Sequence, residues 1–282
     1  MKEPVAVIGA GTMGRGIAQV FAQAGYQAFI YDAIPAAIET GVKDIHRMLD
    51  KGVEKGKLKP EDAAAAKERL RSVRSLSELK PCGLIVEAAT EKLDVKIDVL
   101  RQAQKYLTAD GILATNTSSI SITQLAAATD HPERFVGMHF FNPVPLMQLV
   151  EVVRGLQTSD ETVRRTIEFA KSVGKTPIEC NDHPGFVSNR VLMPMINEAV
   201  FCLQEGVATA EAIDGIMKLG MNHPMGPLAL ADLIGLDVCL FIMEVLHRDL
   251  GEDRYRPCPL LRKYVQAGRL GRKSKHGFYK YE

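Results

Sequence analysis

The sequence predicts a doubly wound α/β protein with a helical-hairpin insertion, followed by an all-α C-terminal domain. Between residues 3 and 180, short β-rich runs alternate with amphipathic stretches, which is the pattern of βαβ units around a mostly parallel sheet. After Cys180, a turn cluster at 181–185 leads into a region of helical periodicity with few β-branched runs. We therefore expect two domains, residues 1–182 and residues 183–282.

Composition limits the class of protein. The chain has 282 residues, 46% of them hydrophobic and 24% charged, so it can bury a real core and disorder is excluded. Its 35 basic and 34 acidic side chains give a net charge of +1, which offers no general attraction to nucleic acid or to an anionic membrane. No apolar run approaches the roughly 18 residues of a membrane span.

The start of the chain and its cysteines indicate a compartment. Residues 1–4 lead straight into the strand-like run 5–8, which leaves no room for a signal peptide before the fold begins. The five cysteines are odd in number and irregularly spaced, which favours reduced thiols over a disulfide framework or a zinc site. We expect a soluble, cytoplasmic protein whose cysteines serve in packing.

The α/β part contains seven predicted strands. They cover residues 5–9, 28–32, 84–88, 111–115, 135–141, 149–153 and 176–179. The long charged segment 35–71 between the second and third strands predicts two antiparallel helices joined near Pro60.

The C-terminal part has helices that are rich in Met and Leu. Apolar side chains between residues 191 and 203 fall on one face of a predicted helix. The helices look too apolar for a unit of about 100 residues, a size near the low end for domains. We expect a homodimer formed through this part, although packing of these side chains on the first domain is an equally good explanation.

A glycine-rich loop follows the first strand and opens an amphipathic helix. It has the pattern Gly-x-Gly-x-x-Gly and consists of Gly9, Ala10, Gly11, Thr12, Met13 and Gly14. The three glycines allow a tight turn, close approach of the backbone to a pyrophosphate, and close packing of helix on strand. The free N–H groups of the helix N-terminus then favour the anion. These features predict a Rossmann-type dinucleotide-binding domain.

Asp32 ends the second strand, at the distance from the glycine loop where a carboxylate can accept hydrogen bonds from an adenosine ribose. The carboxylate would repel a 2′-phosphate, and no arginine follows it directly, so NAD is favoured over NADP. Asp32 could also be an ordinary turn residue at the end of a strand.

His139 is the strongest candidate for chemistry. It lies near the end of an apolar strand, and Glu151 lies within the next one. If the two strands are antiparallel about a turn centred on residue 145, His139 and Glu151 are direct neighbours. The carboxylate would then orient the imidazole and raise its basicity, leaving the second ring nitrogen to take a proton. A histidine satisfied within the core is the alternative.

Two further sites could bind substrate. Asn116 and Ser118 belong to a polar run, 116–119, that follows the fourth strand, and Asn189 opens the first helix of the second domain. The run could instead be a helix N-cap box, and Asn189 a helix-surface amide. The other histidines lie in polar or turn contexts without a comparable acid partner, so we interpret them as surface or capping residues.

The chain resembles the L-3-hydroxyacyl-CoA dehydrogenase family, and most closely its short bacterial 3-hydroxybutyryl-CoA members. The resemblance runs from residue 4 to residue 281 and rests on the motifs at 9–14, 116–119, 139–145, 184–190 and 224–227. It implies an NAD-dependent oxidoreductase that interconverts (S)-3-hydroxybutyryl-CoA and acetoacetyl-CoA.

The resemblance also implies roles for individual residues. His139 matches the catalytic base, Glu151 the acid that orients it, and Ser118 and Asn189 the groups that bind the substrate oxygen. Contacts to the cofactor are implied for four more residues, Glu91, Lys96, Asn116 and Lys273. Lys51 and Lys55 fall in the helical hairpin where the family binds coenzyme A, but the local sequence is loose and a solvated helix face is the better explanation. No metal is implied.

Overall fold

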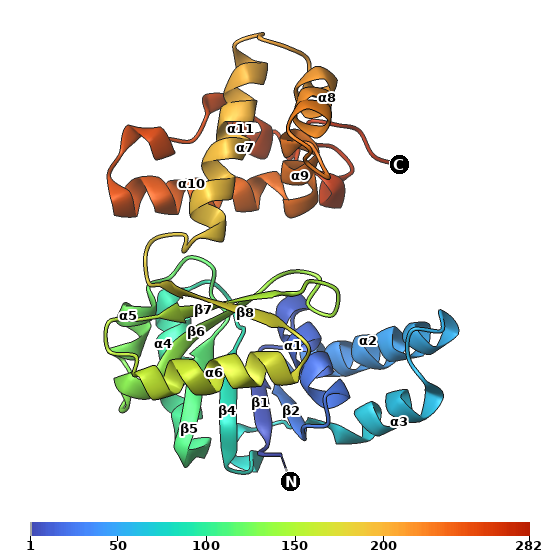
Figure 1. Cartoon of the computed structure of the whole chain (residues 1–282), viewed down its shortest axis with the longest axis vertical. Helices are drawn as coiled ribbons and strands as arrows, with labels where there is room; N and C mark the ends of the chain where they lie inside the picture. Colours follow the sequence, from blue (N-terminus) through green and yellow to red (C-terminus); the bar gives the residue numbers. More distant parts are fainter. Residues whose placement is uncertain (1) are drawn as a thin grey trace. The chain divides into compact units, whose positions relative to one another are not determined.

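The computed structural model describes residues 2–282 and divides into two compact units, one ending at Asp182 and the other beginning at His183 (Figure 1). The first unit is a mixed, mainly parallel sheet with helices, and the second is built from helices. This confirms the predicted fold class.

The first unit is organised around one eight-stranded sheet with the order β3-β2-β1-β4-β5-β6-β7-β8. All neighbouring strands are parallel except β6 and β7, which are antiparallel. The strands are β1 (Val5–Ile8), β2 (Ala28–Tyr31), β3 (Leu70–Ser72), β4 (Cys82–Glu87), β5 (Leu107–Thr115), β6 (Phe135–Phe140), β7 (Leu149–Arg154) and β8 (Thr176–Asn181). Helices α1 (Thr12–Gln23), α4 (Leu93–Ala103), α5 (Ile122–Ala126) and α6 (Asp160–Ser172) complete the α/β pattern.

The central segments form β-strands because most of their side chains are apolar on both faces of the sheet. Every residue of β1, β4 and β6 is buried, as expected for parallel strands covered by helices. Two strands differ most from the prediction, while the bounds of the others differ by one or two residues. β3 has only three residues, too few to show the alternation of side chains that is typical of a strand. It forms because Leu70 and Ser72 pair with Ala28 and Ile30 of β2. β5 begins at Leu107, before an irregularity in its register with β4.

The segment between β2 and β3 forms the expected helical hairpin, with α2 (Pro35–Glu54) and α3 (Pro60–Arg69). Pro60 occupies the first turn of α3, where its missing N–H costs nothing. An ion pair of 2.6 Å between Lys67 and Asp50 joins the two helices. Ile45 and Leu49 of α2 are buried in the same core as α1, so the hairpin is anchored to the first unit.

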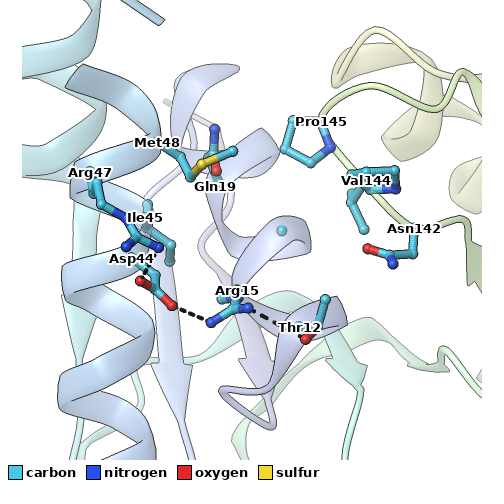
Figure 2. A pocket seen from close by; sticks show the side chains of 12 residues that line it. Thr12, Arg15, Gln19, Asp44, Ile45, Arg47, Met48, Asn142, Val144 and Pro145 are labelled. Atoms are coloured by element: carbon cyan, nitrogen blue, oxygen red, sulfur yellow. Dashed lines mark hydrogen bonds and ion pairs between the residues drawn. The ribbon is translucent and has the colours of Figure 1, made fainter. Parts of the chain in front are cut away.

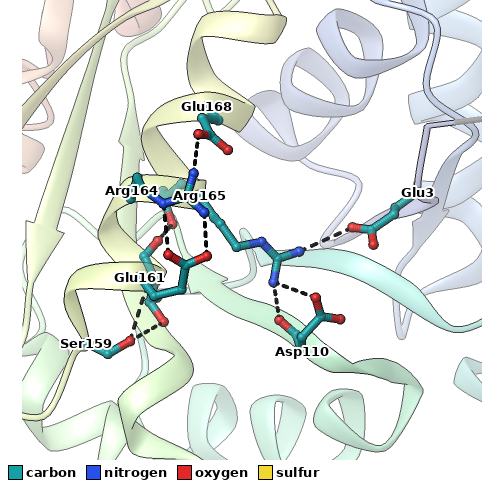
Figure 3. A network of polar contacts seen from close by, with 9 residues as sticks. Glu3, Asp110, Ser159, Glu161, Arg164, Arg165 and Glu168 are labelled. Carbon is teal, nitrogen blue, oxygen red and sulfur yellow. Dashed lines mark hydrogen bonds and ion pairs between the residues drawn. The ribbon is translucent and has the colours of Figure 1, made fainter.

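Helix α6 is fixed to the rest of the first unit by charged side chains (Figure 3). Ser159 caps its N-terminus by accepting a hydrogen bond from the Thr162 amide at 3.2 Å. Arg165 reaches the carboxylates of Asp110 at 3.1 Å and Glu3 at 3.3 Å. Arg164 pairs with two acids of its own helix, but these pairs are exposed to solvent and contribute little to stability.

The second unit has its own hydrophobic core, which includes Met193, Leu228 and Leu246. Its helices are α7 (Ser188–Gln204), α8 (Ala210–Gly220), α9 (Pro227–Ile234), α10 (Leu236–Leu250) and α11 (Pro259–Gln266). The buried Asp214 carboxylate accepts the amides of Leu228 and Ala229 at 2.8 and 2.9 Å, which caps the start of α9. Among residues 2–282, no helix is both long and apolar enough to cross a membrane.

None of the five cysteines forms a disulfide within residues 2–282. Three of them, Cys82, Cys239 and Cys258, are buried. Burial raises the thiol pKa of Cys82, and likewise of Cys239, to about 12. These thiols are therefore protonated at neutral pH and serve in packing.

Candidate active site

His139 and Glu151 are cross-strand neighbours, as the sequence predicts. The antiparallel register of β6 and β7 pairs the two residues directly. The Nδ1 atom of His139 lies 2.8 Å from Oε2 of Glu151, and the two residues are only 8% and 4% exposed. Since the carboxylate accepts only, the hydrogen bond places the proton of a neutral imidazole on Nδ1, and Nε2 is then the basic nitrogen.

A buried lysine, Lys175, donates hydrogen bonds to the turn between β6 and β7. The turn contains a cis peptide bond between Asn142 and Pro143. The Nζ of Lys175 donates to the carbonyl oxygens of Val144 at 2.5 Å and Met147 at 2.8 Å. Burial lowers the pKa of Lys175. Lys175 has no local signal in the sequence, because it lies 28–31 residues from the turn carbonyls and reaches them through the pairing of β8 with β7.

The polar run after β5 is tied to the strand that carries His139. The side-chain oxygen of Asn116 accepts the Phe140 amide at 2.9 Å. Glu91 accepts the Thr117 hydroxyl at 2.9 Å and the Ser118 amide at 3.1 Å. The alternative of an N-cap box at 116–119 is wrong, because α5 begins at residue 122 and Ser121 caps it. These contacts put Ser118 at the carboxyl edge of the sheet, as expected.

The glycine loop is built around close backbone contacts. A Cβ atom on Gly14 would lie 1.8 Å from the carbonyl oxygen of Gly9, so α1 packs against the loop at a distance that only glycine permits. A Cβ atom on Gly11 would meet no atom within 4 Å, which leaves the backbone there open to a ligand. Gly11 is also the N-cap of α1 and supplies no side-chain cap, so the first amide groups remain suited to an anion.

Asp32 supports this loop directly. One carboxylate oxygen accepts the Ala10 amide at 2.7 Å and the other accepts the Ile34 amide at 2.9 Å. Asp32 is therefore a turn residue that also stabilises the glycine loop. Both roles are compatible with the predicted hydrogen bonds to a ribose, which stay a prediction. The loop, the uncapped helix and the acid together fit a dinucleotide.

Glu91 and Lys96 lie beside the loop of Ser118 in a charged cluster that includes the buried Glu87. The Nζ of Lys96 lies 2.8 Å from Oε1 of Glu87 and 3.5 Å from Glu91, and Lys96 is 1% exposed. Glu87 was not among the predicted site residues, and its signal in the sequence is an acid at the end of an apolar strand. In the second unit, Lys273 pairs with Asp237 at 2.6 Å. The predicted cofactor contacts of Glu91, Lys96, Asn116 and Lys273 stay predictions.

A pocket of about 170 Å³ lies between α1, α2 and the β6–β7 turn (Figure 2). Arg15 donates to the Asp44 carboxylate and, at 3.4 Å, to the Thr12 hydroxyl, and Arg47 pairs with Asp44 at 2.6 Å. Two guanidinium groups thus share one carboxylate beside the glycine loop. None of these three charged residues was among the predicted site residues.

Lys51 and Lys55 do not line this pocket. Both are exposed at the end of α2, so each is a solvated side chain in this structure. Asn189 lies in the first turn of α7 and is 8% exposed, so the helix-surface alternative is wrong. His131 and His247 have carboxylate partners at 3.3 and 3.9 Å, but they are surface pairs, unlike His139.

The glycine loop and the buried histidine at the carboxyl edge of the sheet define a nicotinamide-dependent dehydrogenase class. Two family models match the chain: the NAD binding domain of 3-hydroxyacyl-CoA dehydrogenase at residues 4–183 and the C-terminal domain of the same enzyme at residues 185–281. The chain belongs to the 3-hydroxyacyl-CoA dehydrogenase family.

Full-length relatives agree with this assignment. The chain is 59% identical over 277 residues to a probable 3-hydroxybutyryl-CoA dehydrogenase of Deinococcus radiodurans, covering 98% of this chain and 99% of the relative. It is 50% identical to the 3-hydroxybutyryl-CoA dehydrogenase of Bradyrhizobium diazoefficiens, covering 98% of this chain and 94% of the relative. The crystal structure of an (S)-3-hydroxybutyryl-CoA dehydrogenase from Ralstonia eutropha matches with a TM-score of 0.96 at 49% identity, covering 100% of both chains.

Proposed function

We propose that the protein interconverts (S)-3-hydroxybutyryl-CoA and acetoacetyl-CoA with NAD as the hydride carrier. The observation that carries the proposal is the buried pair of His139 and Glu151, with 2.8 Å between Nδ1 and Oε2, at the carboxyl edge of an NAD-binding domain. The full-length similarity to 3-hydroxybutyryl-CoA dehydrogenases supports the choice of substrate.

In the proposed mechanism, His139 acts as the general base. Its Nε2 removes the proton of the C3 hydroxyl group, while Glu151 holds the ring and stabilises the imidazolium that forms. Bound NAD supplies the acceptor for the C3 hydride. In the reverse direction the protonated imidazole returns its proton to the oxygen. Ser118 and Asn189 are proposed to hydrogen-bond that oxygen and to stabilise the charge that develops on it.

The residues that would bind NAD are those of the glycine loop, Gly9 to Gly14, with Asp32 on the adenosine ribose. The open backbone at Gly11 and the uncapped N-terminus of α1 support the pyrophosphate site. Glu91, Lys96, Asn116 and Lys273 are proposed to complete the cofactor site.

The coenzyme A part of the substrate is proposed to contact the helical hairpin. Lys51 and Lys55 are exposed cations near the end of α2, and such side chains can pair with phosphate groups. Their exposure predicts a contribution to substrate affinity that weakens with added salt, because exposed charges are screened.

A spectrophotometric assay tests the proposed function. We expect NADH oxidation with acetoacetyl-CoA, little with free acetoacetate, and slower oxidation of NADPH because Asp32 opposes the 2′-phosphate. Turnover of free acetoacetate at the same rate would indicate a dehydrogenase of a hydroxy acid without coenzyme A. Binding of NADH without any turnover would indicate an NAD-binding protein that is not an enzyme.

We further propose that the second unit contributes to substrate binding and forms a homodimer, and that the protein is cytoplasmic. Ile216, Leu219 and Met221 are exposed apolar side chains within or beside α8, with Leu219 at 91% exposure, which supports self-association. A light-scattering mass of twice 30.9 kDa is the expected result, and a monomer would contradict it.

A further inference from the structure

Glu87 is a buried carboxylate whose contacts are all inside the protein. It is the last residue of β4 and is 0% exposed. Its two oxygens accept hydrogen bonds from the Nζ of Lys96 at 2.8 and 3.0 Å, from the Thr115 hydroxyl at 2.6 Å, and from the Ala89 amide at 2.6 Å. An ionised carboxylate in the interior is costly unless its lone pairs are used in this way.

Lys96 joins Glu87 to a second carboxylate, that of Glu91. Lys96 is 1% exposed, and its ammonium group lies between Glu87 and Glu91, at 2.8 and 3.5 Å. The Glu91 side chain, in contrast, is 34% exposed. With two carboxylates and one ammonium group, the cluster carries one excess negative charge when all three groups are ionised, and the accessible end of it is Glu91.

The cluster connects the two loops that the proposed reaction requires. On one side, the Ala88 amide donates to the Ile8 carbonyl at 2.7 Å, and a Cβ atom on Gly9 would lie 2.4 Å from the Ala88 carbonyl oxygen. The segment after Glu87 therefore packs directly against the glycine loop. On the other side, Glu91 accepts the Thr117 hydroxyl and the Ser118 amide.

We propose that Glu87 is a positioning residue for both loops. By holding Lys96, it sets the place of the Glu91 carboxylate, and Glu91 in turn fixes the loop of Ser118 beside the glycine loop. This inference rests on the proposed function, since it assigns the two loops to cofactor and substrate. Glu87 itself is too deeply buried to contact either of them.

A double-mutant cycle of Glu87→Gln and Glu91→Gln tests the proposal, with the Kd for NADH measured by NADH fluorescence. Glu87→Gln is expected to raise this Kd about tenfold, because Lys96 loses its main partner and draws Glu91 away from Thr117 and Ser118. The same substitution in the Glu91→Gln background is expected to change the Kd less than threefold, because the Glu91 carboxylate through which Glu87 acts is already absent. Additive effects would overturn the proposal.

A second buried hydrogen bond controls for a loss of stability alone. Thr166 is 0% exposed, and its hydroxyl donates to the Thr162 carbonyl at 2.7 Å, within α6. Thr166→Val is expected to lower Tm and to leave the Kd for NADH and the kcat with acetoacetyl-CoA unchanged, whereas Glu87→Gln worsens both. An equal Kd for the two variants would show that Glu87 contributes only to stability, which would overturn the proposal.

Thr115→Val keeps the test possible if Glu87→Gln does not fold. It removes one donor to Glu87 and also the acceptor of the Thr117 amide, at 2.6 and 3.2 Å, with little change of shape. A smaller rise in the Kd for NADH is therefore expected, and the part that acts through Glu87 is lost in the Glu91→Gln background. An unchanged Kd, or a rise of the same size in that background, would contradict the proposal. The NADH titration requires no turnover, so a wild-type protein that fails to reduce acetoacetyl-CoA would refute the proposed function and leave this test readable.

Discussion

His139→Gln is expected to lower kcat for acetoacetyl-CoA reduction by about 10²- to 10⁴-fold, the usual loss when a general acid–base group is removed. The Kd for NADH is expected to stay within about twofold, because the glycine loop is held by its own close packing and by Asp32, while His139 pairs with Glu151. Glutamine keeps hydrogen-bonding capacity and comparable size, so the variant removes the proton transfer with little change in packing. Steady-state kinetics and an NADH titration on the same preparation check both values.

The matched control is His131→Gln. His131 also contacts a carboxylate, that of Glu133 at 3.3 Å, but the side chains are 61% and 51% exposed. This variant is expected to leave kcat and the Kd for NADH unchanged. Parallel losses of kcat and NADH affinity in His139→Gln would instead indicate that His139 maintains the fold.

Gly14→Ala is expected to weaken NADH binding by about 10- to 100-fold. The added methyl group would lie 1.8 Å from the Gly9 carbonyl oxygen, so either the loop or α1 must shift. Overpacking of this kind typically costs about 1–3 kcal/mol, and a shifted loop no longer presents its amides to the pyrophosphate. NADH fluorescence measures the affinity, and Tm reports the accompanying loss of stability.

Gly215→Ala controls for the substitution of a helical glycine. Gly215 lies in α8 of the second unit, and a Cβ atom there would meet nothing within 4 Å. Alanine is the better helix former by roughly 1 kcal/mol, so Tm is expected to rise slightly at unchanged NADH affinity. If Gly14→Ala bound NADH as tightly as the wild type, the close packing of the glycine loop would have no role in cofactor binding.

The parts of the fold that sequence could predict are those with a strong local pattern. The apolar runs of β1 and β6 and the glycine loop each carry their signal within a few residues. β3 has no such signal, since Leu70 to Ser72 become a strand only because β2 offers an unpaired edge. The start of β5 has no clear strand pattern for a related reason, because Thr108 and Asp110 interrupt the apolar run.

The same distinction applies to the candidate site. The contact of His139 with Glu151 follows from two strands joined by one turn, so symmetry about residue 145 was sufficient. Lys175 and Glu87 act through contacts between segments that are distant in sequence: 28–31 residues from Lys175 to the turn carbonyls, and 28 residues from Glu87 to Thr115. Arg15 and Asp44 likewise come from different helices. Such contacts depend on the assembled sheet and leave no spacing rule in the sequence.

The tautomer of His139 tests the central claim most directly. Two-dimensional ¹H–¹⁵N spectroscopy of the imidazole, recorded at a pH where the ring is neutral, distinguishes a proton on Nδ1 from one on Nε2. In the wild type we expect the Nδ1–H form, with the proton donated to Glu151 and Nε2 as the basic nitrogen. A neutral ring with its proton on Nε2 in the wild type would contradict this central claim.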